Sequence, residues 1–156
     1  MIIIDFDLNP SKHYMCISTA EYGNVHFANL FEPGLNMLKK VLIADDYDDI
    51  RDMMVLVIEG LGYQVIEAKN GAEAVDLAAE HKPNVILMDL AMPFMDGVEA
   101  TQEIRSREDL AHIPIIAITA FGSQYADQAR EAGCDQILPK PVDIFTLKPI
   151  LETYVH

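Results

Sequence analysis

The sequence predicts an α/β domain built on a doubly wound, five-stranded parallel sheet. From residue 41 onward, short apolar runs of strand length alternate with longer segments in which apolar residues recur at helical spacing. The apolar runs are continuous rather than alternating, which is typical of strands that helices cover on both faces. Five such strand–helix repeats fit between residues 41 and 156, which indicates a flavodoxin-like order.

The five expected strands are short runs rich in Val, Ile and Leu, enclosed by polar or turn-forming residues. They are residues 41–44, 63–67, 85–88, 113–118 and 136–138. Because a helical segment follows each of them, all five can run in the same direction.

The five expected helices follow these strands in alternation. Asn70 is expected to cap the second helix, because a side-chain oxygen at that position accepts a hydrogen bond from the first turn. Gly133 is expected to end the fourth, because glycine readily adopts the left-handed backbone that often follows a helix. The helices are residues 47–60, 72–81, 98–106, 123–132 and 143–154.

The first of these helices contains a long apolar run, Met53–Ile58. Its expected inner face holds Ile50, Met54, Val57 and Leu61. The run is longer than one helix face can bury. We expect the surplus to pack deeply between the sheet and a neighbouring helix, and a dimer or partner surface is the alternative.

The composition narrows the class of protein. Of the 156 residues, 51% are apolar and 23% are charged, as in globular domains. The net charge of −14 argues against nucleic acids or anionic membranes as partners, because like charges repel. Cys16 and Cys134 show no CxxC spacing, and no apolar run spans a membrane or forms a signal peptide. A cytoplasmic location is therefore expected.

The character of the sequence changes near residue 37. Residues 1–37 show no sustained period and are expected to form an irregular N-terminal extension. This extension is either disordered or not natively translated, with Met37 as the natural start in the second case. Residues 38–156 form the expected folded domain. Because only two residues follow the last predicted helix, we expect no output domain and a domain that stands alone.

Chemically active side chains stand where four of the strands end. Asp45 and Asp46 follow the first strand, Asp89 the third, Thr119 the fourth, and Lys140 the fifth. In a sheet of this kind the carboxyl ends of the strands meet at one edge, and ligands bind there. We therefore expect three carboxylates, one hydroxyl and one amine to converge.

These residue types favour phosphoryl chemistry. Clustered carboxylates raise one another's pKa, and Mg²⁺, which prefers carboxylate, water and phosphate oxygens, relieves their repulsion. Asp89 could then stay ionised and attack phosphorus to give an aspartyl-phosphate. Lys140 would add a positive charge, and Thr119 a hydroxyl for a phosphoryl oxygen. Each residue alone can be explained as a cap, a turn residue or a solvated charge, but such explanations do not predict the whole set in this order.

The same positions resemble the receiver domains of bacterial two-component response regulators, over residues 38–154. The most specific part is the stretch Met92-Pro93-Phe94-Met95-Asp96-Gly97. The segments that carry the resemblance are residues 41–46, 85–97, 114–120 and 138–141.

The resemblance implies a phosphoacceptor and a metal site. Asp89 would take a phosphoryl group from a phosphohistidine on a histidine kinase or a histidine phosphotransfer protein. Mg²⁺ would be the cofactor, and its ligands would be Asp45, Asp46, Asp89 and the backbone carbonyl of Ala91.

The resemblance also implies switch residues. Lys140 would contact the phosphoryl group and precede a cis peptide bond at Pro141. Thr119 would move toward the phosphate, and the small Ala120 would leave access to the acceptor. One position departs from the family pattern, because Ile137 stands where receivers often carry an aromatic switch residue. This departure puts the usual aromatic readout in question.

These observations predict a receiver that accepts phosphate on Asp89 and then switches a surface for a downstream effector protein or relays the phosphate. Beyond self-phosphorylation and self-dephosphorylation, no enzyme activity is expected. The alternative is a phosphorylation-independent protein-interaction module that has kept the fold. A phosphatase or nucleotide-binding enzyme is disfavoured, because no Gly-rich phosphate loop follows the first strand.

Overall fold

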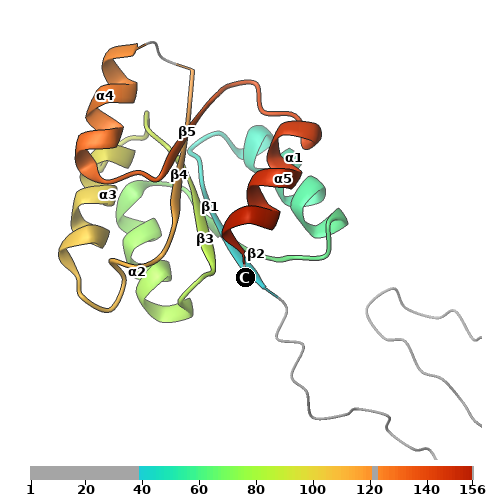
Figure 1. Cartoon of the computed structure of the whole chain (residues 1–156), viewed down its shortest axis with the longest axis horizontal. Coiled ribbons are helices and arrows are strands. Elements are labelled where there is room, and N and C mark those ends of the chain that lie inside the picture. Colours follow the sequence, from blue (N-terminus) through green and yellow to red (C-terminus); the bar gives the residue numbers. More distant parts are fainter. Residues whose placement is uncertain (1–38, 121–122, 156) are drawn as a thin grey trace, which may run out of the picture. The chain divides into compact units, whose positions relative to one another are not determined.

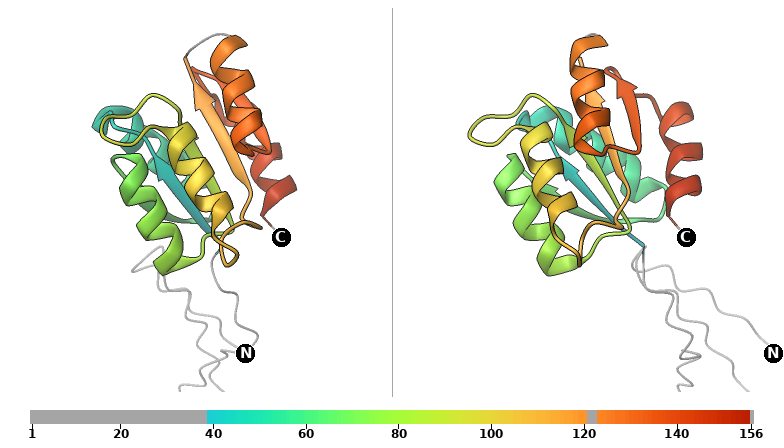
Figure 2. Two further views of the ribbon diagram at one scale, coloured as in Figure 1. Left: turned by 90° about the vertical axis from the view of Figure 1, so that its left-hand side faces the viewer. Right: turned by 60° about the vertical axis from the view of Figure 1, so that its left-hand side comes forward.

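Five parallel strands form one sheet, in the order β2-β1-β3-β4-β5, in the computed structural model, which describes residues 39–120 and 123–155. The arrowheads of the strands point to the same end of the sheet (Figure 2). This arrangement confirms the predicted doubly wound, flavodoxin-like sheet. The predicted N-terminal extension, residues 1–37, lies outside the described residues. The strands are β1 (Lys40–Ala44), β2 (Gln64–Ala68), β3 (Val85–Asp89), β4 (Ile115–Thr119) and β5 (Gln136–Pro139).

Helices cover both faces of this sheet (Figure 1). The helices α1 and α5 lie on one face, and α2, α3 and α4 lie on the other. Their bounds are α1 (Asp48–Gly60), α2 (Gly71–His81), α3 (Gly97–Ser106), α4 (Ser123–Ala132) and α5 (Ile144–Tyr154). Within the described part of the chain, no helix is both long enough and apolar enough to cross a membrane.

Alternate residues of each central strand supply the two halves of the core. On β1, Leu42 packs with residues of α2 and α3, whereas Val41 and Ile43 pack with residues of α1 and α5. On β3, Ile86 and Leu87 divide in the same way. All five side chains are buried. The strands are therefore apolar without interruption because both of their faces lie under helices.

The predicted helix ends at Asn70 and Gly133 are confirmed. The Asn70 side chain accepts a hydrogen bond from the backbone N–H of Glu73 at 2.9 Å, and so caps the start of α2. Gly133 follows α4 with φ of +103°, a left-handed conformation that costs glycine little.

The predicted start of the fourth strand is two residues early. Ile113 is buried, but its N–H bonds the carbonyl of Leu110 at 2.9 Å and so belongs to the turn that follows α3. Pro114 has no N–H to give to a neighbouring strand. The ladder of β4 therefore begins at Ile115.

The inner face of α1 also differs in part from the prediction. Met54 is buried as predicted, and the other three predicted residues are partly buried against the same core: Ile50, Val57 and Leu61. The prediction did not include the two remaining buried positions of this helix, Arg51 and Ile58. Met53 and Leu56 are 52% and 73% exposed, so the prediction that the whole apolar run packs deeply is wrong. The helix thus presents apolar side chains to solvent and a guanidinium to the interior.

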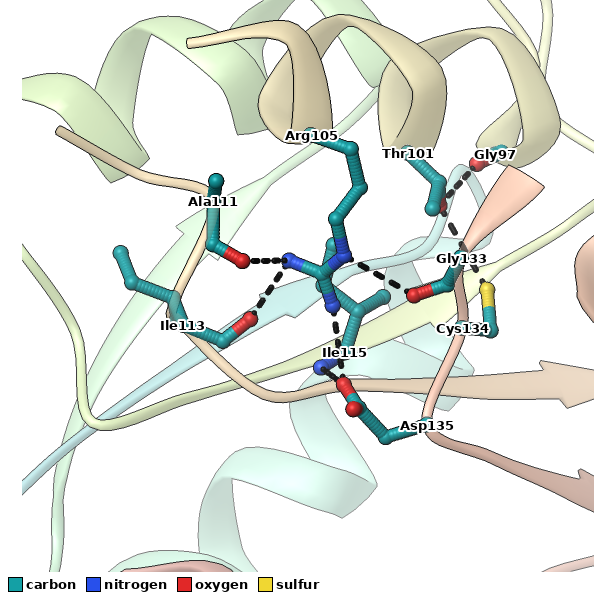
Figure 3. Close-up of polar contacts among 9 residues, drawn as sticks. All are labelled: Gly97, Thr101, Arg105, Ala111, Ile113, Ile115, Gly133, Cys134 and Asp135. Carbon is teal, nitrogen blue, oxygen red and sulfur yellow. Dashed lines mark hydrogen bonds and ion pairs between the residues drawn. The ribbon is translucent and has the colours of Figure 1, made fainter. Parts of the chain in front are cut away.

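A single arginine ties the far edge of the sheet to α3 (Figure 3). The Arg105 Nε donates to the carbonyl of Gly133 at 2.9 Å, and Nη1 donates to the carbonyls of Ala111 and Ile113 at 3.1 and 2.8 Å. Its Nη2 donates to Asp135 at 2.8 Å. Arg105 thereby joins the turn before β4 to the turn between α4 and β5.

We expect Arg105→Met to lower the free energy of unfolding by about 2–3 kcal/mol, because it leaves three carbonyls and a carboxylate without this donor. Urea denaturation with an unchanged m-value measures the effect. The matched control is Arg107→Met, since the Arg107 guanidinium lies 3.9 Å from Asp109 in a weak, partly exposed pair. That variant should change stability by no more than about 0.5 kcal/mol. Equal losses in the two variants would contradict the role of Arg105.

Candidate functional site

Three carboxylates meet at the carboxyl end of the sheet. Ala44 on β1 is the partner of Met88 on β3, so the next residues of the two strands, Asp45 and Asp89, lie side by side. Asp46 follows directly. One carboxylate oxygen from each of the three aspartates lies within 4.8 Å of the others. Asp45 and Asp89 are 2% and 5% exposed, so water screens their charges poorly.

The amine that the sequence places after β5 reaches this cluster. The Lys140 Nζ lies 2.7 Å from Oδ2 of Asp45 and 2.6 Å from Oδ2 of Asp89, and so bridges the two carboxylates. The backbone N–H of Lys140 donates to the carbonyl of Thr119 at 2.9 Å, which holds the ends of β4 and β5 together. The Lys140–Pro141 peptide bond is cis.

Backbone amides hold the other oxygen of each bridged carboxylate. The N–H of Tyr47 donates to Oδ1 of Asp45 at 2.9 Å, and the N–H of Ala91 donates to Oδ1 of Asp89 at 3.1 Å. Both bonds span two residues, the pattern of an Asx turn. Asp45 and Asp89 are therefore oriented by the first residues of the loops that follow their strands.

Asp46 lacks such partners. Its Oδ1 is buried and has no hydrogen-bond partner among the described residues. A buried carboxylate oxygen without a partner is costly, because it has lost water without gaining a donor. The three carboxylates and one ammonium also leave a formal charge of −2. An orphaned oxygen and a twofold negative charge fit a divalent cation with oxygen ligands, such as Mg²⁺.

Two glycines clamp the loop between β3 and α3. A Cβ on Gly97 would stand 2.1 Å from the carbonyl oxygen of Asp89, and a Cβ on Gly71 would stand 2.6 Å from the carbonyl oxygen of Met95. The Gly71 N–H also donates to Met95 at 3.0 Å. Only glycine permits such close approach of two backbones. The clamped loop contains Ala91, so the backbone beside Asp89 has a defined course.

Burial and charge act in opposite directions on the ionisable groups. Burial raises the pKa of Asp89, and hydrogen bonds from Lys140 and from the Ala91 amide offset this only in part. Burial also disfavours the charged form of Lys140, but its hydrogen bonds to Asp45 and Asp89 outweigh burial and raise its pKa. Lys140 therefore keeps its proton, while Asp89 takes one up more easily than an ordinary aspartate.

The remaining predicted residues lie on β4 and β5 or directly after β4. Thr119 is buried at the end of β4, one position beyond Ile118, the partner of Asp89. Ala120 follows and is exposed. Ile137 is half-buried on β5 and packs against the small cluster that Leu90, Ala117 and Ala129 form.

Two further residues that the sequence does not single out also support the site. Gly71 is one of them, because its close contact with Met95 needs a glycine. Arg51 was not singled out at all, although it donates to the carbonyl of Asp45 at 2.8 Å. The one sequence feature that could have pointed to Arg51 is its position on α1, three residues after Asp48, where the two side chains can form an ion pair.

Comparison with known proteins agrees with this geometry. Residues 41–152 match the response regulator receiver domain family. The polar-differentiation response regulator DivK of Brucella anthropi is 36% identical over 120 residues, which cover 76% of this chain and 98% of that protein.

Solved structures show the same fold. The chemotaxis protein CheY4 of Vibrio cholerae has a TM-score of 0.71 and 30% identity, over 76% of this chain and 99% of that one. The receiver domain of the sensor histidine kinase PA1611 of Pseudomonas aeruginosa has a TM-score of 0.71 and 32% identity, over 75% and 97% of the two chains. In that structure a magnesium ion is coordinated in the active site cleft. The present chain belongs to the response regulator receiver domain family.

Proposed function

We propose that this chain accepts a phosphoryl group on Asp89 from a phosphohistidine partner, in a Mg²⁺-dependent reaction of two-component signalling. One observation carries the proposal. Asp45, Asp46 and Asp89 lie within 4.8 Å of one another, and the Lys140 ammonium bonds two of them. A nucleophilic carboxylate, a cation site and a fixed positive charge are the groups that phosphoryl transfer to an aspartate requires.

The chain's own residues would divide the work as follows. A carboxylate oxygen of Asp89 forms the new bond to phosphorus while the bond from phosphorus to the donor's imidazole nitrogen breaks. The Ala91 amide, which already donates to Asp89, holds that carboxylate in place. Lys140, now 2.6 Å from Asp89, would transfer its hydrogen bond to a phosphoryl oxygen. Thr119 would contact another phosphoryl oxygen and Ala120 would leave room for it.

Asp45, Asp46, Asp89 and the carbonyl of Ala91 would hold the Mg²⁺ ion. When bound, the ion would neutralise charge on the phosphoryl oxygens and on the crowded carboxylates. The magnesium in the cleft of the similar PA1611 receiver supports this assignment.

The expected output is a contact with an effector protein. The similarity to DivK extends over 98% of that protein, so a response regulator can consist of this fold alone. A partner protein would then read the phosphorylated state. The packing of Ile137 beneath α4 favours a readout that does not use an aromatic side chain.

Incubation with acetyl phosphate and Mg²⁺ should add one acid-stable, hydroxylamine-labile phosphate per chain, and Asp89→Asn should abolish it. The amide is a poor nucleophile and cannot form the acyl phosphate. The control is Asp76→Asn, which removes the same charge from an exposed position on α2 and should label like the wild type. Undiminished labelling of Asp89→Asn would disprove Asp89 as the acceptor. Equal affinity of an effector for both phosphorylation states would instead favour the phosphorylation-independent module.

Mg²⁺ affinity should fall as the pH is lowered, and the fall should begin above the range of an ordinary aspartate. Burial raises the pKa of Asp89, and a protonated carboxyl cannot ligate the ion. Mg²⁺ binding should therefore release protons over a pH range that extends above that of an ordinary aspartate. Calorimetric titration in two buffers of different ionisation enthalpy measures this release. An affinity that does not change with pH over that range would contradict the role of Asp89 as a ligand.

The exposed apolar residues of α1 should contribute to docking of the phosphodonor protein. Leu56 is 73% exposed on the helix that follows Asp45 and Asp46. Leu56→Glu should slow phosphotransfer from a histidine phosphotransfer protein by about tenfold, equivalent to about 1.4 kcal/mol. Labelling by acetyl phosphate, which needs no protein contact, should not change. Equal slowing with both donors would show that the substitution damages the pocket rather than docking.

A further inference from the structure

Arg51 places a guanidinium beneath the loop that joins β1 to α1. The residue is 3% exposed, yet it carries a full positive charge and sits on the first turns of an otherwise amphipathic helix. Its three nitrogens each have a different acceptor. Nη1 donates to the backbone carbonyl of Asp45 at 2.8 Å, Nε donates to Glu67 at 3.1 Å, and Nη2 donates to Asp48.

The bond to Asp45 fixes the peptide group that links the two acidic residues of the pocket. The Asp45 N–H donates to the carbonyl of Ala68 at 3.2 Å, which holds the other side of the same residue. The direction of the peptide plane after Asp45 determines where the Cα of Asp46 stands, and thus where its carboxylate points. The position of the Asp46 Oδ1 atom, which lacks a partner, therefore depends on the Asp45–Asp46 peptide plane, and Arg51 holds that plane through the Asp45 carbonyl.

The carboxylates around Arg51 offset the cost of burying it. Burial is the largest single influence on its pKa and lowers it, but the hydrogen bonds and charges of Asp48 and Glu67 outweigh burial, so that the pKa is raised. Those two carboxylates are themselves 72% and 45% exposed. The guanidinium is thus the buried member of the network, and its innermost contact is the backbone of the pocket.

Lysine could not replace this arrangement. The guanidinium is planar and directs its donors at fixed angles, so one side chain can reach a backbone carbonyl and two carboxylates at once. An ammonium is a compact charge on a flexible stem, and it would lose at least one of the three fixed contacts. The pocket would keep its net charge but not the support of the Asp45 carbonyl.

We propose that Arg51 is a positioning residue for the cation site, which holds the Asp45–Asp46 peptide so that both carboxylates face the ion. The inference rests on the proposed function, because it assumes a divalent cation at the aspartate cluster. Arg51 donates to the backbone carbonyl of Asp45 and to Asp48 and Glu67, so it would act on the cation site through the backbone of Asp45. Groups that orient the ligands of a metal in this way typically change its affinity by about 10–100-fold.

The test is the affinity for Mg²⁺ itself, measured by calorimetry on wild type, Arg51→Lys and Arg51→Met, each first shown to be folded by circular dichroism. Arg51→Lys keeps the charge and loses the geometry, and should bind Mg²⁺ about tenfold more weakly than the wild type. Arg51→Met loses both and should bind no more tightly than Arg51→Lys. Wild-type affinity in Arg51→Lys would overturn the proposal. Tighter Mg²⁺ binding by Arg51→Met than by Arg51→Lys would overturn it too, because repulsion between the positive charge at position 51 and the cation would then be the main effect.

A second pair of variants avoids any change in the interior. Asp48→Asn weakens one anchor of Arg51 at an exposed side chain, and Asp49→Asn removes the same charge from the neighbouring exposed residue, for which no contact with Arg51 is seen. Asp48→Asn should lower Mg²⁺ affinity more than Asp49→Asn does. Equal effects would mean that only charge matters and would overturn the positioning role. Failure of the wild type to bind Mg²⁺ would instead refute the proposed function itself.

Discussion

Mutual repulsion among three carboxylates is the constraint around which this domain is organised. The parallel order of β1 and β3 forces Asp45, Asp46 and Asp89 together at one edge of the sheet, where little water remains to screen them. One ammonium, that of Lys140, compensates only part of this charge. The pocket is therefore well ordered but retains an excess of negative charge, which a divalent cation would neutralise.

The surrounding structure keeps the acids in place against this repulsion. Amides of the following loops bind two of the carboxylates, and glycine allows the loop after β3 to lie directly on the backbone of Asp89. The Thr119 carbonyl fixes the backbone from which Lys140 reaches across. Of the three aspartates, only Asp46 keeps a buried carboxylate oxygen without a hydrogen-bond partner among the described residues.

The fold and the meeting of the pocket residues were predictable because both follow from simple rules. Continuous apolar runs such as Val85–Met88 identify strands buried on both faces, and parallel strands bring their carboxyl ends together wherever they lie in the sequence. The sequence alone therefore predicts that Asp89 and Lys140, which are 51 residues apart, meet in one pocket. The start of β4 was misplaced because Ile113 is as apolar as a strand residue but serves a turn.

The supporting contacts were not predictable, because their partners come from other elements. Arg51 reads as a solvent-facing residue of a helix unless Glu67, which lies on β2, is known to stand beside it. The need for glycine at Gly71 arises from Met95, a residue of a distant loop. Such facts depend on the relative positions of elements, which periodicity along one element does not contain.

The contacts of Arg105 have a mechanical consequence for α4. They fasten the carbonyl of Gly133 and the side chain of Asp135, at the carboxyl end of that helix, to α3. The opposite end of α4 follows Thr119 along the chain, on the side of the sheet that bears the pocket. Because α4 also packs against α3 and β5, loss of the Arg105 contacts would loosen the carboxyl end of this helix first, away from the edge of the sheet that carries the aspartates.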